Sequence, residues 1–285
     1  MKIKQSGFTL TEITIVLLIV GILLGYTVAL FPQQQRLKQY RAVNAEMDLI
    51  LEAIIGFAQV NGRLPCPALA ATNGGEDTDD DNTAPGIELG CNNYGGFVPY
   101  NALGLEGRLN SDNLMVDPWN NPYRYYVTDA DFNGNNQSDF VFPNEMRLIG
   151  LVDRDNDTYI DLDGAYMICE DPGATIDDEC LSDDTTIFGR FSATGGPYAG
   201  APIVLLSMGK NWNEGAPTGD ELVNAGSSLL PNIGGADFYR IKDVSTQTTF
   251  VQRRDGGLAD DLDDVVRWVP PNVLYSRMIK ANKLP

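Results

Sequence analysis

Two acidic stretches in the second half of the chain have the residue types and the spacing that bind a hard metal ion. In the later stretch carboxylates alternate with other residues and two more acids follow; the candidate ligands are Asp153, Asp155, Asp157, Asp161 and Asp163. Ca²⁺ prefers carboxylate and carbonyl oxygens and accepts several of them in flexible geometry. The sequence therefore predicts a calcium site in this loop.

The earlier stretch begins 24 residues before the later one and repeats its spacing. Its candidate ligands are Asp129, Asp131, Asn133, Asn135 and Asp139. Neither stretch is a good match to an EF-hand, which needs Gly at its sixth position and Glu at its twelfth. The sixth position is Gly134 in the earlier loop and Thr158 in the later one, and Glu is absent from the twelfth position of both.

The alternative interpretation is that both stretches are solvated acidic turns, because Asp and Asn tolerate turn geometry. Clustered carboxylates repel one another unless a cation neutralises them, and the nearest cations in the sequence are Arg147 and Arg154. We favour calcium, with the later loop ahead of the earlier one. The acids within 77–81 are less suitable, because most of them are consecutive and cannot all face one ion.

The four cysteines fall into two local pairs, Cys66 with Cys91 and Cys169 with Cys180. An even number of cysteines outside a reducing compartment favours disulfides, although four cysteines allow three connectivities. We predict the local pairing, with free buried thiols as one alternative. A zinc site is a weaker alternative, because neither pair has the tight spacing of a zinc motif.

Composition argues against catalysis and against nucleic-acid binding. The chain contains no histidine, which is the commonest general base and the commonest transition-metal ligand. No phosphate-binding loop, dinucleotide-binding motif or nucleophile elbow is present. A formal net charge of −19 repels nucleic acid and attracts cations. We therefore expect a protein that is not an enzyme.

The N-terminus places one acid beside a long apolar run. A short tail with Lys2 and Lys4 precedes Gly7, and after Glu12 the residues 13–31 carry no charge. That length is sufficient to cross a membrane as a helix. In an ordinary secretory signal the small residue of the cleavage site follows the apolar run. Here Gly7 precedes it, so cleavage after Gly7 would keep the apolar helix and leave Glu12 near a new α-amino group at Phe8.

The stretch from Gly7 to Glu12, read as GFTLTE, resembles the class III signal of type IV pilins and of type II secretion pseudopilins. The resemblance implies that a prepilin peptidase cuts after Gly7 and methylates the amino group of Phe8. It also implies that Glu12 neutralises the amino terminus of a neighbouring subunit during assembly at an inner-membrane platform. An ordinary signal peptide and a plain single-pass anchor are the alternatives.

The resemblance and the sequence pattern together predict an α+β fold. A leader, 1–7, precedes a long helix, 8–60, whose first part, 8–31, is the membrane or filament-core half. Pro32 should kink or break this helix, and beyond it apolar residues recur at three- and four-residue steps, which is typical of an amphipathic helix. We expect a connecting loop over 61–122 and a β-rich head over 123–285.

Within the head, short apolar runs bounded by turn residues predict strands. They are Tyr123–Thr128, Met146–Val152, Ala165–Cys169, Ile187–Ser192, Ile203–Ser207, Phe238–Ile241 and Thr248–Gln252. Three further segments are similar to pseudopilin heads: DPWNNPY from Asp117, LSMGKN from Leu206 and DDVVRW from Asp263.

These observations predict a structural subunit of a type IV pilus-like bacterial filament. It waits in the inner membrane with its head outside the cytoplasm, and then joins copies of itself in an extracellular or periplasmic filament. One alternative is a pseudopilin of type II secretion, major-like or minor. Another is a membrane-tethered calcium-binding or adhesive ectodomain that does not polymerise.

Overall fold

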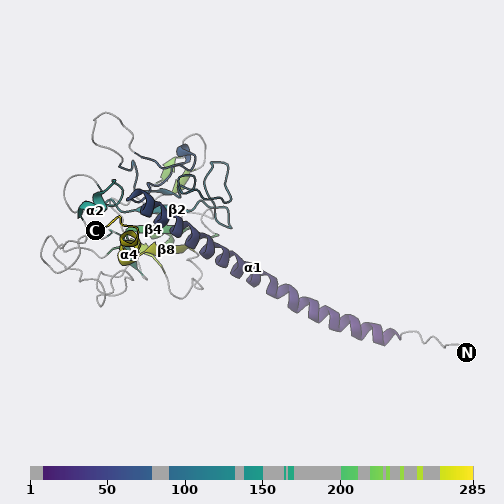
Figure 1. Ribbon diagram of the computed structural model, residues 1–285. Coiled ribbons are helices and arrows are strands. Elements are labelled where there is room, and N and C mark those ends of the chain that lie inside the picture. The colour runs from purple at the N-terminus through teal and green to yellow at the C-terminus, as the bar shows by residue number, and fades with distance from the viewer. Residues whose placement is uncertain are drawn as a thin grey trace, which may run out of the picture. The chain divides into compact units, whose positions relative to one another are not determined.

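The computed structural model describes residues 9–78, 90–131, 138–149, 164, 166–169, 200–210, 219–226, 229–231, 238–240, 249–252 and 264–284. The chain divides into two compact units, residues 1–42 and 43–285 (Figure 1). The helix α1, Leu10–Asn61, provides the described part of the first unit and continues into the second.

Helix α1 has an aliphatic first part and an amphipathic second part. The predicted break at Pro32 is wrong, because α1 is helical on both sides of this residue. A proline removes one backbone hydrogen bond, and long helix-forming stretches on either side can propagate across it. The helix ends where Gly62 takes a left-handed conformation, with φ of 72°, and donates its N–H to the carbonyl of Ala58 at 2.8 Å.

An antiparallel sheet of four strands lies at the centre of the second unit. The strands are β1 Gly95–Phe97, β2 Arg124–Val127, β4 Ile203–Ser207 and β8 Val265–Val269, in the order β1-β2-β4-β8. Every neighbouring pair is antiparallel. A long N-terminal helix followed by an antiparallel sheet is the α+β arrangement that the sequence predicts.

Both faces of the sheet are buried, by different parts of the second unit. One face, with Tyr125 of β2 and Leu205 of β4, packs against Met47, Ile50 and other residues of α1. The same cluster includes Leu274 and Met278 from α4, Pro271–Lys280. This burial on both faces explains why the strands read as continuous apolar runs rather than as alternating ones.

The opposite face is covered by shorter elements. Tyr126 of β2 contacts Phe250 of β7, Thr249–Val251, with ring centroids 5.0 Å apart, and Tyr166 meets the same ring edge-on. Strand β7 pairs in parallel with β3, Met167–Cys169. The remaining elements are the 3-10 helix Ala70–Thr72, α2 Glu145–Ile149, α3 Gly219–Ala225 and the antiparallel pair β5 Leu229–Pro231 and β6 Phe238–Arg240.

Several sequence predictions are confirmed and others are wrong. Strands β2, β3, β4, β6 and β7 lie within predicted runs. The run Met146–Val152 is wrong, since residues up to Ile149 form helix α2. The region 61–122 is not loop throughout, because it contains β1. The run Ile187–Ser192 lies outside the described residues. Helices α3 and α4 and strands β5 and β8 were not among the predicted elements.

Candidate functional site

The start of α1 is organised around Glu12. Thr9 precedes the first helical residue, and its backbone N–H and hydroxyl both donate to the Glu12 carboxylate at 2.8 Å. The N–H of Glu12 in turn lies 3.4 Å from the Thr9 hydroxyl oxygen. This reciprocal arrangement is a capping box, which satisfies backbone donors that have no partner within the helix.

The capping box fixes where the only acid of the first unit lies. Glu12 is exposed in the first turn of α1, among exposed apolar side chains that include Leu10 and Ile13. A carboxylate in the first helical turn is also favoured by the helix dipole. The site therefore presents one oriented negative charge at the start of an apolar helix, where it can accept a cationic partner.

The predicted processing site, Gly7 and Phe8, lies outside the described residues. Within the part of the chain that is described, no helical stretch meets the length and apolarity needed to span a bilayer. The membrane span predicted over 8–31 therefore stays a prediction.

The second part of α1 is tied to the sheet by polar contacts as well as by apolar packing. The hydroxyl of Tyr123 donates to Glu46 at 2.6 Å, and Arg108 lies 3.7 Å from the same carboxylate. Burial, and then the contact with Glu46, raise the pKa of Tyr123 well above its usual value. The tyrosine therefore remains a hydrogen-bond donor at any physiological pH.

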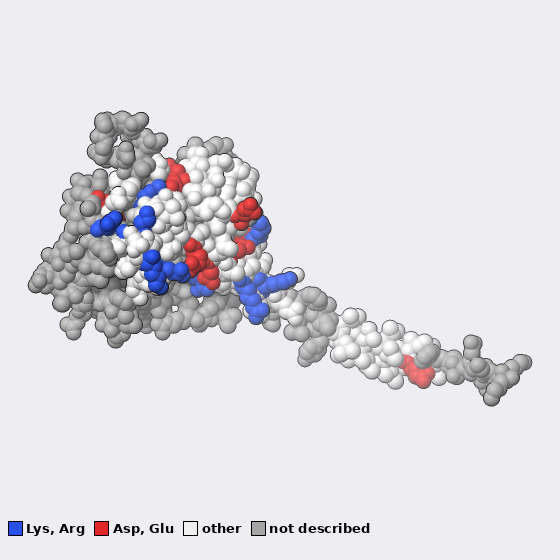
Figure 2. All heavy atoms as spheres, in the orientation of Figure 1, with Lys and Arg blue, Asp and Glu red and all other residues white. Residues whose placement is uncertain are grey.

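Two arginines from the C-terminal part of the chain also contact α1. Arg267 on β8 donates to Asn44 at 2.7 Å and lies 3.6 Å from Asp48. Arg277 on α4 pairs with Glu52 at 2.9 Å. Each exposed pair contributes only about 0.2–1 kcal/mol. Together these pairs help to orient the helix on the apolar residues of the sheet against which it packs. Acidic and basic side chains lie next to each other on the face shown in Figure 2.

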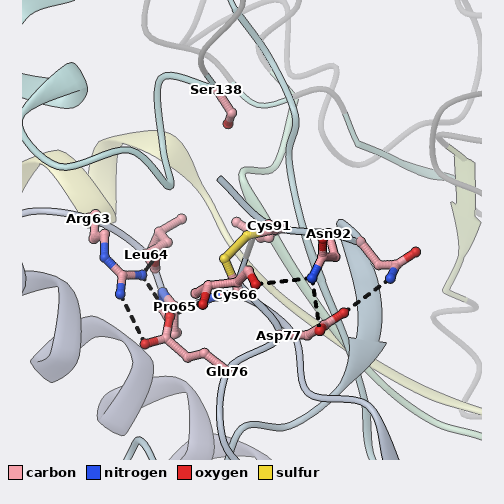
Figure 3. Close-up of a disulfide and its surroundings, with 12 residues drawn as sticks. Arg63, Leu64, Pro65, Cys66, Glu76, Asp77, Cys91, Asn92 and Ser138 are labelled. Carbon is pink, nitrogen blue, oxygen red and sulfur yellow. Dashed lines mark hydrogen bonds and ion pairs between the residues drawn. A yellow bond between two sulfur atoms is a disulfide. The ribbon is translucent and has the colours of Figure 1, made fainter. Parts of the chain in front are cut away.

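The chain that leaves α1 is held by a disulfide. Cys66 and Cys91 are joined at a sequence separation of 25, which confirms the predicted local pairing (Figure 3). Of the second predicted pair, Cys169 belongs to β3 and Cys180 lies outside the described residues. That pairing stays a prediction.

An ion pair between Arg63 and Glu76 lies next to the disulfide. Arg63 and Glu76 form two contacts, at 2.7 Å and 3.0 Å, and the same carboxylate accepts the N–H of Cys66 at 2.7 Å (Figure 3). Asp77 accepts hydrogen bonds from the side chains of Asn92 and Asn93. The two ends of the loop between the cysteines are thus joined by one covalent and several polar links.

A second buried polar junction unites two segments that the sequence singled out. Asp117 accepts the backbone N–H groups of Trp119 and Asn121 at 2.9 Å and the hydroxyl of Ser207 at 2.6 Å. The side chain of Asn121 donates to the carbonyl of Gly209. The DPWNNPY and LSMGKN segments therefore meet through buried hydrogen bonds, although they lie far apart in sequence.

This junction predicts a pH effect on stability. Burial is the largest influence on Asp117 and raises its pKa, while hydrogen bonds from Ser207 and the backbone oppose this rise. A carboxyl whose pKa is raised by folding binds its proton more tightly in the native state. Its contribution to the free energy of unfolding therefore increases as the pH falls through the native pKa towards the unfolded value.

We expect the Asp117→Asn variant, which keeps an acceptor oxygen for the backbone donors, to lose this contribution. The difference in unfolding free energy between the native chain and the variant should change between neutral pH and about pH 4. Urea titrations at several pH values measure it. A difference that stays constant over this range would contradict the assignment.

The structure describes part of the earlier predicted calcium loop. Asp129, Asp131 and Asp139 are described, whereas Asn133 and Asn135 lie outside the described residues. The N–H of Asp139 donates to the carbonyl of Ala130 at 2.8 Å, so the two ends of the loop are adjacent. Burial raises the pKa of Asp129. Asp129 is half-buried, and a carboxylate in such a site is stabilised when a cation binds it.

The later calcium loop cannot be compared with the structure. Its five predicted ligands, Asp153, Asp155, Asp157, Asp161 and Asp163, lie outside the described residues. Among the residues that are described, no three acidic or cysteine side chains come close enough together to hold a metal ion. Calcium binding therefore stays a prediction.

Sequence reasoning missed the polar contacts that tie α1 to the head. Glu46 and Asp48 lie among the apolar positions of the amphipathic part of the helix, and no partner was predicted for either. The charges alone were a partial indication, because the helix supplies acids and the C-terminal elements β8 and α4 supply arginines. Opposite charges on two amphipathic segments suggest contact, but many other pairings of charges in the chain are equally compatible.

Comparison with known proteins identifies the N-terminal stretch. Residues 2–28 match a family model described as the prokaryotic N-terminal methylation motif. No curated protein and no solved structure matches the chain.

The matched stretch contains Gly7, Phe8 and Glu12 in the order that the sequence resemblance requires. The chain therefore carries the class III prepilin signal found in precursors of type IV pilins and pseudopilins. Such signals are processed by a prepilin peptidase. The family of the remaining residues is not identified by the comparison.

Proposed function

We propose, from the class III prepilin signal at residues 2–28, that the chain is a structural subunit of a type IV pilus-like bacterial filament. The precursor waits in the inner membrane with its head outside the cytoplasm. A prepilin peptidase cuts between Gly7 and Phe8 and methylates the new amino group. The mature subunit then polymerises through α1 into an extracellular or periplasmic filament.

The observation that carries this proposal is the geometry of Glu12. Its carboxylate is exposed and is oriented by the capping box with Thr9, and it lies four positions along the sequence from the predicted mature terminus. Cleavage creates a cationic α-amino group at Phe8, and a neighbouring copy can present that cation to Glu12. An unpaired carboxylate in an apolar helix bundle is unfavourable, so the pairing selects one register of assembly.

A pseudopilin of a type II secretion system is the second candidate, and a specific observation favours it. The segments that resemble pseudopilin heads are brought together: Asp117 bonds to Ser207, and β8, which contains most of DDVVRW, pairs with β4. Both candidates share the same processing and the same role for Glu12. They differ in where the filament accumulates.

A tethered ectodomain that does not polymerise is the third candidate. It would use the calcium loops or other surfaces of the head for binding, and it would not need Glu12. We assign no catalytic role under any of these candidates, because the sequence offers no histidine and no recognisable nucleophile motif.

The decisive experiment is to shear producing cells, collect extracellular filaments and determine the intact mass and the N-terminal residue. Abundant protein that starts at methylated Phe8 supports a surface pilus subunit. The same terminus found only in the membrane fraction supports a pseudopilin. A chain that still starts at Met1 would refute the proposal and favour the tethered ectodomain.

We also propose that at least one acidic loop of the head binds calcium. At a free Ca²⁺ concentration about 100 times the dissociation constant, the native state should gain about 2.7 kcal/mol. Thermal unfolding of the full chain in detergent measures this gain, with Mg²⁺ as the control ion. The Asp153→Asn, Asp155→Asn double variant should lose most of it.

The matched variant for the earlier loop is Asp129→Asn, Asp131→Asn, which changes the charge by the same amount. It should lose less of the calcium effect, because we place the later loop first. Equal melting temperatures with and without Ca²⁺ in the native chain would rule out both loops.

A further inference from the structure

Three cations on α1 have no acidic partner among the residues that the structure describes. Arg36, Lys38 and Arg41 are all exposed, and no described acid lies within ion-pair distance of any of them. Four arginines of the second unit behave differently, since each is paired with an acid; they are Arg63, Arg108, Arg267 and Arg277. We call the three residues Arg36, Lys38 and Arg41 the basic collar.

The charge of the chain is divided unevenly between its two units. The first 42 residues of the precursor hold five cations and one acid, a net charge of +4, so the total of −19 leaves −23 on residues 43–285. Removal of Lys2 and Lys4 with the leader leaves the three collar cations and Glu12, a side-chain charge of +2. Figure 2 shows basic side chains gathered on the described part of α1. The collar is therefore a basic segment in a chain whose other unit is strongly acidic.

A strongly acidic unit repels its own copies. Bringing many such units together in a polymer increases this repulsion, and nearby cations reduce it. A helix turns by about 100° per residue, so Lys38 and Arg41, three residues apart, share one face of α1, and Arg36 lies on the other side. Cations on two sides of the helix can contact acidic neighbours on both.

We propose that the basic collar binds the acidic head surface of neighbouring copies of this chain. This inference rests on the proposed function, since it requires the chain to polymerise. The collar supplies opposite charge at each subunit contact and offsets the repulsion between heads. Glu12 pairs with one terminus, whereas the collar makes a separate ionic contact further along the helix.

The test compares two triple variants of the full chain in producing cells. Arg36→Gln, Lys38→Gln, Arg41→Gln removes the collar. Arg147→Gln, Lys280→Gln, Lys283→Gln removes three cations from the head that likewise have no acidic partner among the described residues. Both variants lower the net charge by three, so a general effect of charge is the same in both.

Sheared filaments are quantified, and their dissociation is followed as NaCl is raised in the presence of EDTA, which removes bound calcium. For the collar variant we expect about tenfold fewer filaments, because several exposed ion pairs are lost at each contact. Native filaments should dissociate as salt rises, since salt screens exposed charges. The head variant should behave like the native chain.

Equal yield and equal salt dependence in the native chain and the collar variant would overturn the inference and leave the proposed function intact. A collar variant that is depleted from the membrane fraction, with filaments of unchanged salt dependence, would also overturn it in favour of lipid headgroups. Absence of filaments from the native chain would instead refute the proposed function.

Discussion

Filaments should be lost when Glu12 is replaced by alanine. The change removes the only acid of the first unit, so the α-amino group of a neighbouring subunit would enter the apolar helix bundle without a partner. Removing one partner of a buried charge pair is strongly unfavourable, and we expect the yield of sheared filaments to fall on the order of a hundredfold or more. Immunoblots of sheared and cell-bound fractions measure the loss.

The structure shows why alanine alone is an ambiguous test. Glu12 also accepts two hydrogen bonds from Thr9 and so caps its own helix. The Glu12→Gln variant separates the two roles, because glutamine can complete a capping box but carries no charge. If charge pairing drives assembly, Gln should fail as alanine does.

The reciprocal control is Thr9→Val, which removes the hydroxyl from the capping box and leaves the charge of Glu12. It should retain processing and most of its filaments. Normal filament yield from Glu12→Gln together with failure of Thr9→Val would show that the cap matters and the charge does not, which would contradict the assigned role of Glu12.

Of the substitutions proposed in the head, removal of the disulfide between Cys66 and Cys91 should lower its stability most. The bond closes a loop of 25 residues in sequence. The entropy that such a closure removes from the unfolded chain corresponds to about 3 kcal/mol. The Cys66→Ser, Cys91→Ser variant should therefore melt about 10 °C below the native chain, as measured by circular dichroism.

Reduction provides the matched comparison. In dithiothreitol the native chain should lose stability, and the double variant should lose less by an amount equal to the contribution of this bond. The Glu76→Gln variant controls for the ion pair with Arg63, because it keeps the disulfide and weakens the contact beneath it. A double variant that melts with the native chain would show that the polar links alone hold the loop.

The features that the sequence predicts correctly depend on residues that lie close together along the chain. The cleavage junction, Glu12 and the apolar run all lie within the first 31 residues, so a contiguous motif carries them. The pairing of Cys66 with Cys91 is also local on the scale of the chain. Strand β4 coincides with its prediction because it is a short, continuous apolar run bounded by turn residues.

The incorrect secondary-structure predictions arise where the local sequence favours a different structure from the one that tertiary contacts stabilise. Gly95 and Gly96 indicate a turn, yet they form β1 because their backbone pairs with β2, and the adjacent Phe97 also pairs with Ala68. The run that begins at Met146 is apolar enough for a strand, but the segment buries Glu145 and Met146 in a short helix. Tertiary pairing outweighs local preference in both segments.

The sequence alone determines that the precursor carries a prepilin signal, that a long helix follows it, and that Cys66 and Cys91 can pair, because each depends on residues close together in the chain. Only the tertiary structure decides how the helix is held on the head. Arg267 and Arg277 reach α1 across 223 and 225 residues of sequence. A contact over that distance depends on the folding of everything between, and no local pattern encodes it.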